Sequence, residues 1–107
     1  MVTEIQALLL AVLVGKVKAH GHAIGKELEQ RRGNPVSVGT LYKGLHSLER
    51  QGYVHSKWEE QLNADYGRPR RRFYRINGAG ERALTEYRDH IETTLRQLPP
   101  RVREAQA

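Results

Sequence analysis

Apolar side chains recur at steps of three and four residues near the start of the chain, which predicts a helix from Thr3, a suitable cap, to about Lys16. The recurring positions are Ile5, Leu8, Leu9, Val12 and Leu13. Leu10, Ala11 and Val14 make the opposite side apolar as well. A helix that is apolar nearly all round needs cover on two sides, so we expect a second subunit on one of them.

Two further helices follow, separated by a short turn. The second is expected over Gly21 to Arg32, where a Gly-Asn-Pro sequence ends it. Ser37 then offers a cap for a third helix, from Ser37 to Gln51, whose inward positions are Leu41, Leu45 and Leu48. The spacing of these leucines defines one buried stripe and leaves the opposite face of the third helix in solvent.

The pattern then changes to alternation, which is typical of half-buried strands. One strand is expected over Tyr53 to Glu60 and a second over Arg70 to Ile76, so that the two form a hairpin. In the second strand, Tyr74 and Ile76 are expected to face the core, and Phe73 falls on the opposite face.

A last helix is predicted after Asn77, a suitable cap, and before Pro99. Because little of the domain remains to cover its apolar stripe, we expect this helix to pair with a second copy of the chain. The residues expected at that dimer interface are Ile5, Leu9, Val12, Leu84, Tyr87, Ile91, Leu95 and Leu98. We therefore divide the chain into residues 1–76, the helices and hairpin, and residues 77–107, the dimerisation helix and a short tail.

Charge adds a candidate chemistry to this plan. The 107 residues carry a net charge of +6, and residues 37–76 contain 8 Lys and Arg against 4 Asp and Glu. A basic excess of this kind favours a polyanionic partner. The chain has no cysteine, which excludes thiolate chemistry and sulfur-based zinc sites. The apolar run over residues 7–14 is too short for a membrane span, so we expect no signal peptide, no membrane anchor and a cytoplasmic location.

The basic residues of the middle third occupy two places. The outward face and first turn of the third helix are polar, and the residues expected to contact DNA there are Ser37, Gly39, Thr40, Tyr42, Lys43, His46, Ser47 and Arg50. The hairpin carries an arginine cluster, of which Arg68, Arg70, Arg71 and Arg72 are expected to contact phosphates. For Tyr42 a boundary position in the core is the alternative, and a solvated charged surface is the alternative for the arginines.

The order helix, helix, helix, hairpin, helix predicts a mainly α fold with a small β-hairpin, arranged as a winged helix-turn-helix. In that plan the third helix enters the major groove and the hairpin, or wing, lies along the DNA backbone. A winged-helix module that binds protein instead of DNA is the alternative. An enzyme is disfavoured because no nucleophile is paired with a base, and RNA binding is disfavoured because the chain lacks an aromatic sheet platform.

Four short stretches carry a resemblance to a known family. They are His20-Gly21-His22-Ala23-Ile24, Ser37-Val38-Gly39-Thr40-Leu41-Tyr42, Gly67-Arg68-Pro69-Arg70 and Tyr74-Arg75-Ile76-Asn77-Gly78-Ala79-Gly80. In order and spacing, from about Leu8 to Leu84, they resemble the PadR family of bacterial transcriptional regulators. The chain departs from the family where His22 replaces a common tyrosine and where Lys43 and Gly78 replace common prolines.

The resemblance implies a dimeric repressor of the short-tailed type, with one helix after the wing, that binds inverted-repeat operators and responds to a small aromatic effector. We expect no cofactor. His20 and His22 have a ligand-like spacing, but nothing near them completes a metal shell, so we assign them a structural role and predict no metal. Trp58 is expected in the core, with an effector pocket as the alternative.

Overall fold

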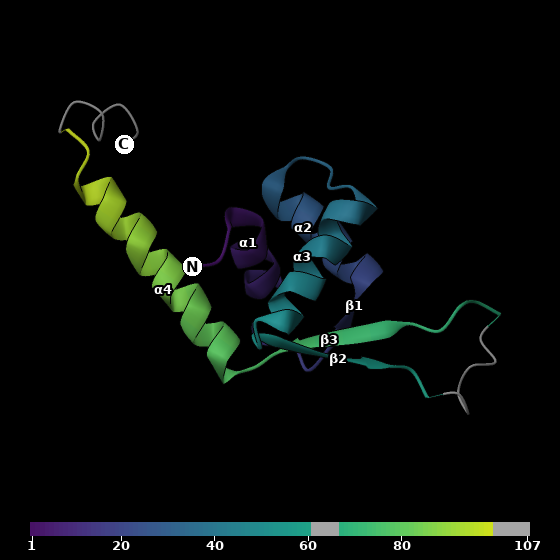
Figure 1. The fold of residues 1–107 in the computed structure, drawn as a ribbon. Coiled ribbons are helices and arrows are strands. Elements are labelled where there is room, and N and C mark those ends of the chain that lie inside the picture. Colours follow the sequence, from purple (N-terminus) through teal and green to yellow (C-terminus); the bar gives the residue numbers. More distant parts are fainter. Residues whose placement is uncertain (61–66, 100–107) are drawn as a thin grey trace.

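The computed structural model describes residues 1–60 and 67–99, and within them seven elements (Figure 1). In chain order these are α1 (Glu4–Leu13), β1 (Ala19–His20), α2 (Gly21–Arg32), α3 (Val38–Arg50), β2 (Val54–Trp58), β3 (Arg72–Ile76) and α4 (Gly78–Arg96). The first three helices form a bundle, the hairpin of β2 and β3 projects from it, and α4 extends beyond it. The mainly α fold with a small antiparallel sheet is confirmed, although α1 and both strands are shorter than expected.

Side chains at the helix starts explain where the helices begin. Thr3 and Gln6 form a capping box at the start of α1, and Ser37 accepts a hydrogen bond from the backbone of Thr40 at the start of α3. Asn77 caps α4 by accepting from the Gly80 backbone at 2.8 Å. The three predicted caps, Thr3, Ser37 and Asn77, are therefore confirmed.

The sheet has three strands in the order β1-β3-β2, one more than predicted. In the β1–β3 ladder, Ala19 lies opposite Tyr74 and His20 opposite Phe73, both antiparallel. This strand was not predicted, because two residues are too few to show an alternating pattern. The extra strand fixes the start of α2 against the middle of the wing.

The core lies where α1, α2, α3 and β3 meet. Its largest fully buried side chains include Tyr74 together with leucines from three helices. Leu9 and Val12 are 0% exposed, so they are covered by their own chain and cannot contact a second subunit directly. Their expected interface role is therefore wrong. The chain itself supplies the second cover of α1, because the first half of α4 folds back against it.

The two halves of α4 have different surroundings. Ala83 is buried, and Leu84 and Tyr87 pack against the core, whereas Ile91 is 37% exposed and Leu95 is 46% exposed. Near its start, α4 also comes very close to the backbone directly before β2. A Cβ atom on Gly80 would lie 2.3 Å from the Tyr53 carbonyl oxygen, so this approach requires a glycine.

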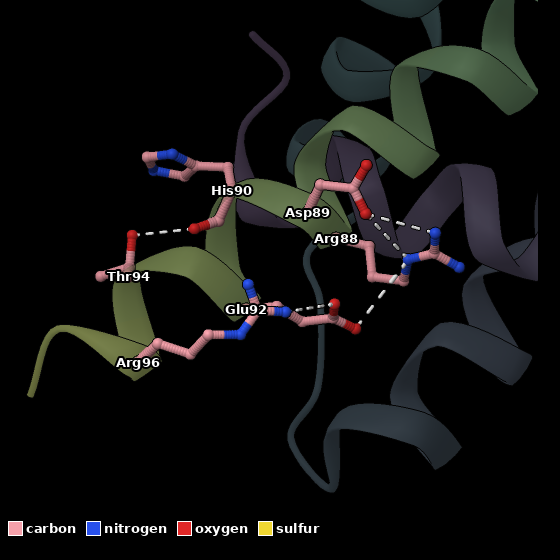
Figure 2. Close-up of polar contacts among 6 residues, drawn as sticks. All are labelled: Arg88, Asp89, His90, Glu92, Thr94 and Arg96. Carbon is pink, nitrogen blue, oxygen red and sulfur yellow. Dashed lines mark hydrogen bonds and ion pairs between the residues drawn. The ribbon is translucent and has the colours of Figure 1, made fainter.

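The polar residues of the second half of α4 contact one another along the helix, as Figure 2 shows. Glu92 lies 4.0 Å from Arg88 and 3.6 Å from Arg96, each one turn away, and Thr94 donates to the His90 carbonyl oxygen. Such pairs support a solvent-exposed helix. Within residues 1–60 and 67–99, no helix is both long and apolar enough to cross a membrane.

Candidate nucleic-acid interface

The outward face of α3 is confirmed as the polar one. Leu41, Leu45 and Leu48 are buried, while the opposite side exposes Gly39, Lys43, His46 and Arg50. None of the exposed side chains on that face is a carboxylate, and the helix has only one acidic residue, Glu49. Two exposed cations one to two turns apart on such a face can reach phosphates or base edges of a duplex.

Glu49 connects α3 to the wing. Its carboxylate accepts a hydrogen bond from Arg72 at 3.0 Å and a second one from the Ser56 hydroxyl. Arg72 in turn donates from Nε to the Ser56 hydroxyl at 2.8 Å. The partly buried network of these three residues fixes the wing strands relative to α3. Arg72, expected to contact phosphate, is thus engaged within the chain.

A second carboxylate, Glu59, organises the end of the wing. Arg68 donates to it at 2.7 and 3.3 Å, and the backbone N–H of Arg71 donates at 2.7 Å. These hydrogen bonds lower the pKa of Glu59 from 4.5 to about 2, and the hydrogen bond from Arg68 has the largest effect. Arg68 and Arg72 are therefore paired with carboxylates, whereas in the described part of the chain no salt bridge holds the side chains of Arg70 and Arg71.

Trp58 is not a core residue, which corrects the sequence analysis. Its side chain is 50% exposed, and the guanidinium carbons of Arg70 and Arg72 lie 5.6 Å from its ring centre. The alternation of β2 did place Trp58 on the same side as Val54 and Ser56, but Trp58 is the last residue of β2, and the wing extends beyond the helices (Figure 1). The result is an exposed aromatic ring among cations.

Tyr42 packs inward instead of facing away from the bundle. If Gly21 carried a Cβ atom, that atom would lie 2.2 Å from the Tyr42 hydroxyl, so the ring lies directly against the start of α2. The side chain is half-buried and contacts the core. This geometry favours the boundary alternative for Tyr42 and explains why a glycine follows His20.

Other predicted contact residues are engaged within the chain. Ser37 and Thr40 hydrogen-bond to each other at 2.9 Å in the first turn of α3. Ser47 accepts hydrogen bonds of 3.1 Å from the side chains of Gln6 in α1 and Gln51. Ser47 thus links the third helix to the first, which the sequence did not indicate.

The two histidines at the start of the second helix have the expected structural role. His20 Nδ1 accepts from the Ala23 backbone at 3.3 Å, which caps α2, and the His20 and His22 rings stack with centres 6.3 Å apart. Burial and the nearby Arg71 lower the pKa of His20 below 6.5, which favours the neutral ring that an accepting nitrogen requires. In the described residues no cluster of three potential metal ligands occurs.

Between α3, the start of α2 and the wing lies a cleft of about 530 Å³. Its lining combines aromatic and cationic side chains, with Trp58 and the arginines on the wing side and His46 on the helix side. Tyr74 also lines the cleft, and its buried hydroxyl has no hydrogen-bond partner among the described residues. His46 of α3 and the arginines of the wing therefore border one concave surface.

A family model of PadR-like transcriptional regulators matches residues 9–86. The chain belongs to the PadR family. It is a transcriptional regulator of that family, and the family resemblance read from the sequence is confirmed. The match runs from the second half of α1 to the first half of α4 and includes both the exposed face of α3 and the wing.

Relatives of known sequence or structure agree with this assignment. Transcriptional regulator Rv3488 of Mycobacterium tuberculosis is 44% identical over 81 residues, which are 76% of this chain and 70% of that protein. A PadR-like transcription factor from Bacteroides fragilis is 25% identical with a TM-score of 0.70, and the match covers 85% of this chain and 82% of that one. The predicted winged-helix architecture is thereby confirmed.

A second solved structure is of a PadR protein in complex with DNA. Bacillus subtilis PadR, in complex with operator DNA, matches with a TM-score of 0.66 and 16% identity, over 79% of this chain and 46% of that one. At that identity the likeness shows the fold alone. The assignment to the family therefore rests on the sequence matches, and the roles of individual residues rest on the geometry above.

The functional residues that the sequence analysis missed are those that hold the surface in shape. Glu49, Glu59 and Gln6 each join segments that are distant along the chain. Their partners lie 23, 12 and 41 residues away, and no local pattern indicates a pairing over such separations. The only available signal was that Glu49 is the single acid in a basic helix.

Proposed function

We propose that this PadR-family regulator binds double-stranded DNA as a homodimer, with the exposed face of α3 in the major groove and the wing on the backbone. The observation that carries the proposal is that the exposed face of α3, with Lys43 and Arg50, lies on a helix joined through Glu49 and Arg72 to a wing that carries Arg70 and Arg71. The side chains of Lys43, Arg50, Arg70 and Arg71 take part in no salt bridge within residues 1–60 and 67–99. An unneutralised basic surface around an exposed helix is what a duplex requires.

We assign different roles to the exposed face of α3 and to the wing. Lys43, His46 and Arg50 project from a helix that can enter the major groove, so they read base edges. Arg70 and Arg71 lie on the wing and contact phosphates, which adds affinity without sequence preference. Arg68 and Arg72 support the wing through Glu59 and Glu49, and that support replaces the direct phosphate contact expected of them.

Dimerisation is proposed through the second half of α4. Ile91 and Leu95 lie one turn apart and are both exposed, and they continue the stripe that Leu84 and Tyr87 begin in the core. The polar pairs shown in Figure 2 line the other sides of this helix. A second copy of α4 packed along the stripe would cover these side chains and hold two α3 helices about one turn of DNA apart.

The regulatory role follows from the family and is part of the proposal. A dimer with two reading helices favours inverted-repeat operators in the cytoplasm, where occupancy of an operator represses transcription. Relief of repression by a small aromatic effector remains a prediction from the family resemblance. A winged-helix module that binds only protein is the competing function.

Selection from random duplexes, followed by salt titration of the enriched sequence, tests the proposal. If each subunit neutralises about four phosphates, the logarithm of the affinity falls with the logarithm of the salt concentration at a slope of about −7. An enriched inverted repeat with a steep slope supports the proposal. No enriched sequence, or a slope near zero, favours the protein-binding module.

Two alanine variants separate the proposed duties. Lys43→Ala should relax base preference at one position of each half-site at a cost of about 1 to 3 kcal/mol, because it removes a base contact. Arg71→Ala should weaken binding to all duplexes alike and make the salt slope shallower. Arg82→Ala, which removes an exposed cation from α4, is the matched control and should change neither property. Equal behaviour of all three variants would contradict the division of roles.

A further inference from the structure

The arginines that line the cleft between α3 and the wing outnumber the carboxylates that pair with them. Four arginines line the cleft, and among the described residues no carboxylate does. Arg68 is paired with Glu59 and Arg72 with Glu49 behind the lining, whereas in residues 1–60 and 67–99 no salt bridge holds the Arg70 and Arg71 side chains. Two positive charges thus remain on one side of a cleft whose volume, about 530 Å³, is typical of small-molecule sites.

The same cleft offers aromatic surface. Trp58 is half-exposed, and the guanidinium groups of Arg70 and Arg72 lie over its ring. Arg72 is held by Glu49 and Ser56, but Arg70 is exposed and can leave the ring. A planar group can therefore replace the Arg70 guanidinium against Trp58, and Arg70 then becomes available for an anion attached to that group.

A third observation is independent of the exposed charges. Tyr74 lines the cleft, is 0% exposed, and has a hydroxyl without a hydrogen-bond partner in the described part of the chain. A buried hydroxyl normally has a partner, because leaving it without one costs free energy. Because Tyr74 is closed to solvent, an acceptor atom at the floor of the cleft can satisfy this hydroxyl only when the side chains that cover it move aside. Burial and core packing alone would have been served equally well by phenylalanine.

We propose that this cleft binds a free nucleoside monophosphate, with the base against Trp58 and the phosphate on Arg70 and Arg71. A phosphate monoester carries a charge of about −1.5 to −2 at pH 7, which matches the two unneutralised arginines better than a carboxylate or a backbone phosphodiester does. Because the cleft is part of the surface proposed for DNA, a bound nucleotide competes with the duplex. Only this competition rests on the proposed function, since the binding itself does not.

The fluorescence of Trp58, the only tryptophan of the chain, reports occupancy of the cleft directly. We expect AMP to quench it saturably, with a Kd about tenfold lower than the Kd for adenosine or inorganic phosphate, because neither fragment makes both contacts. A dinucleoside monophosphate, which holds a phosphodiester, distinguishes a free nucleotide from a segment of nucleic acid. If it binds as tightly as AMP, or if adenosine or phosphate does, the proposal is wrong.

Arginine variants test the location. Arg70→Ala should raise the Kd for AMP about tenfold through loss of a charge-assisted contact. Arg75→Ala removes an exposed arginine of β3 that does not line the cleft, and it should leave the Kd unchanged. Equal Kd values for the two variants would place the nucleotide elsewhere and overturn the assignment.

A displacement experiment separates this inference from the proposed function. AMP at saturating concentration should release a labelled duplex that contains the selected operator, and a duplex that stays bound would refute the competition. If no duplex binds the protein but AMP still quenches Trp58 in an Arg70-dependent manner, the nucleotide site stands and the DNA proposal fails. If the duplex binds and AMP does not quench, the reverse holds.

Discussion

Replacing Gly80 with alanine tests how closely α4 is seated on the rest of the molecule. The added Cβ atom would lie 2.3 Å from the Tyr53 carbonyl oxygen and 2.7 Å from Ile76 Cγ1, whereas ordinary contact begins at 3.4 Å. The carbonyl oxygen must therefore retreat by about 1 Å. It cannot do so freely, because it accepts a hydrogen bond of 3.2 Å from the Asn77 backbone.

The magnitude follows from two opposing effects. Alanine is favoured over glycine in a helix by up to about 1 kcal/mol, whereas overpacking a tight contact costs about 1 to 3 kcal/mol. Since the obstacle is backbone, we take the upper part of that range and expect a net loss of about 2 kcal/mol. At roughly 4 to 8 °C per kcal/mol, Tm falls by about 8 to 16 °C.

The assay is thermal unfolding followed by circular dichroism at one fixed protein concentration, because the Tm of a dimer depends on concentration. Gly39→Ala is the matched control, since no atom outside its own neighbourhood lies within 4 Å of the added Cβ. It should raise Tm through helix propensity alone. If Gly80→Ala melts at or above the temperature of the unmodified protein while the control behaves as expected, the tight seating of α4 is refuted.

Four further outcomes are expected. The pKa of Glu59 is about 2 in the folded state against its usual 4.5, so its hydrogen bonds stabilise the protein above pH 4.5. This stabilisation is lost as the pH falls toward 2. The free energy of unfolding, measured in urea between pH 5 and 2, should therefore depend less on pH in Glu59→Gln. Ser37→Ala should lower the free energy of unfolding by about 1 kcal/mol in urea titrations, and a stability unchanged within error would argue against the cap. Glu49→Gln should lower the free energy of unfolding by about 0.5 to 1 kcal/mol in urea titrations and weaken DNA binding measured by fluorescence anisotropy. If stability and binding both stayed unchanged, the network around Glu49 would be contradicted. Ile91→Arg combined with Leu95→Arg should give a monomer in sedimentation at micromolar concentration, whereas a persistent dimer would mean that another surface pairs.

The local part of the fold could be predicted from the sequence. The start of each long helix depends on a cap within three residues of it, and the buried face of α3 depends on the spacing of its leucines, so both are written in short stretches of chain. The exposed face of α3 was confirmed for the same reason. The short β1 escaped prediction because its two residues acquire their structure from pairing with β3.

The errors share a different cause, which is contact between distant segments. Leu9 and Val12 were assigned to a dimer interface because local periodicity shows how apolar a helix is but not which element covers it. Trp58 was assigned to the core because alternation gives the side of a strand, not how far the underlying helices extend. The arginines of the wing looked equivalent in sequence until Glu49 and Glu59 distinguished them.

The hydrogen bond from Gln6 to Ser47 bears on how the two half-sites of an operator must be rotated relative to each other about the DNA axis. Since Ser47 lies in α3 and Gln6 in α1, and α1 packs against α4, the reading helix cannot swivel independently of the proposed dimer axis. Inserting one base pair between the half-sites advances the second by about 3.4 Å and rotates it by roughly 35°. A rigid pair of reading heads cannot follow that rotation, so the protein should discriminate operators by the length of a spacer that it never touches.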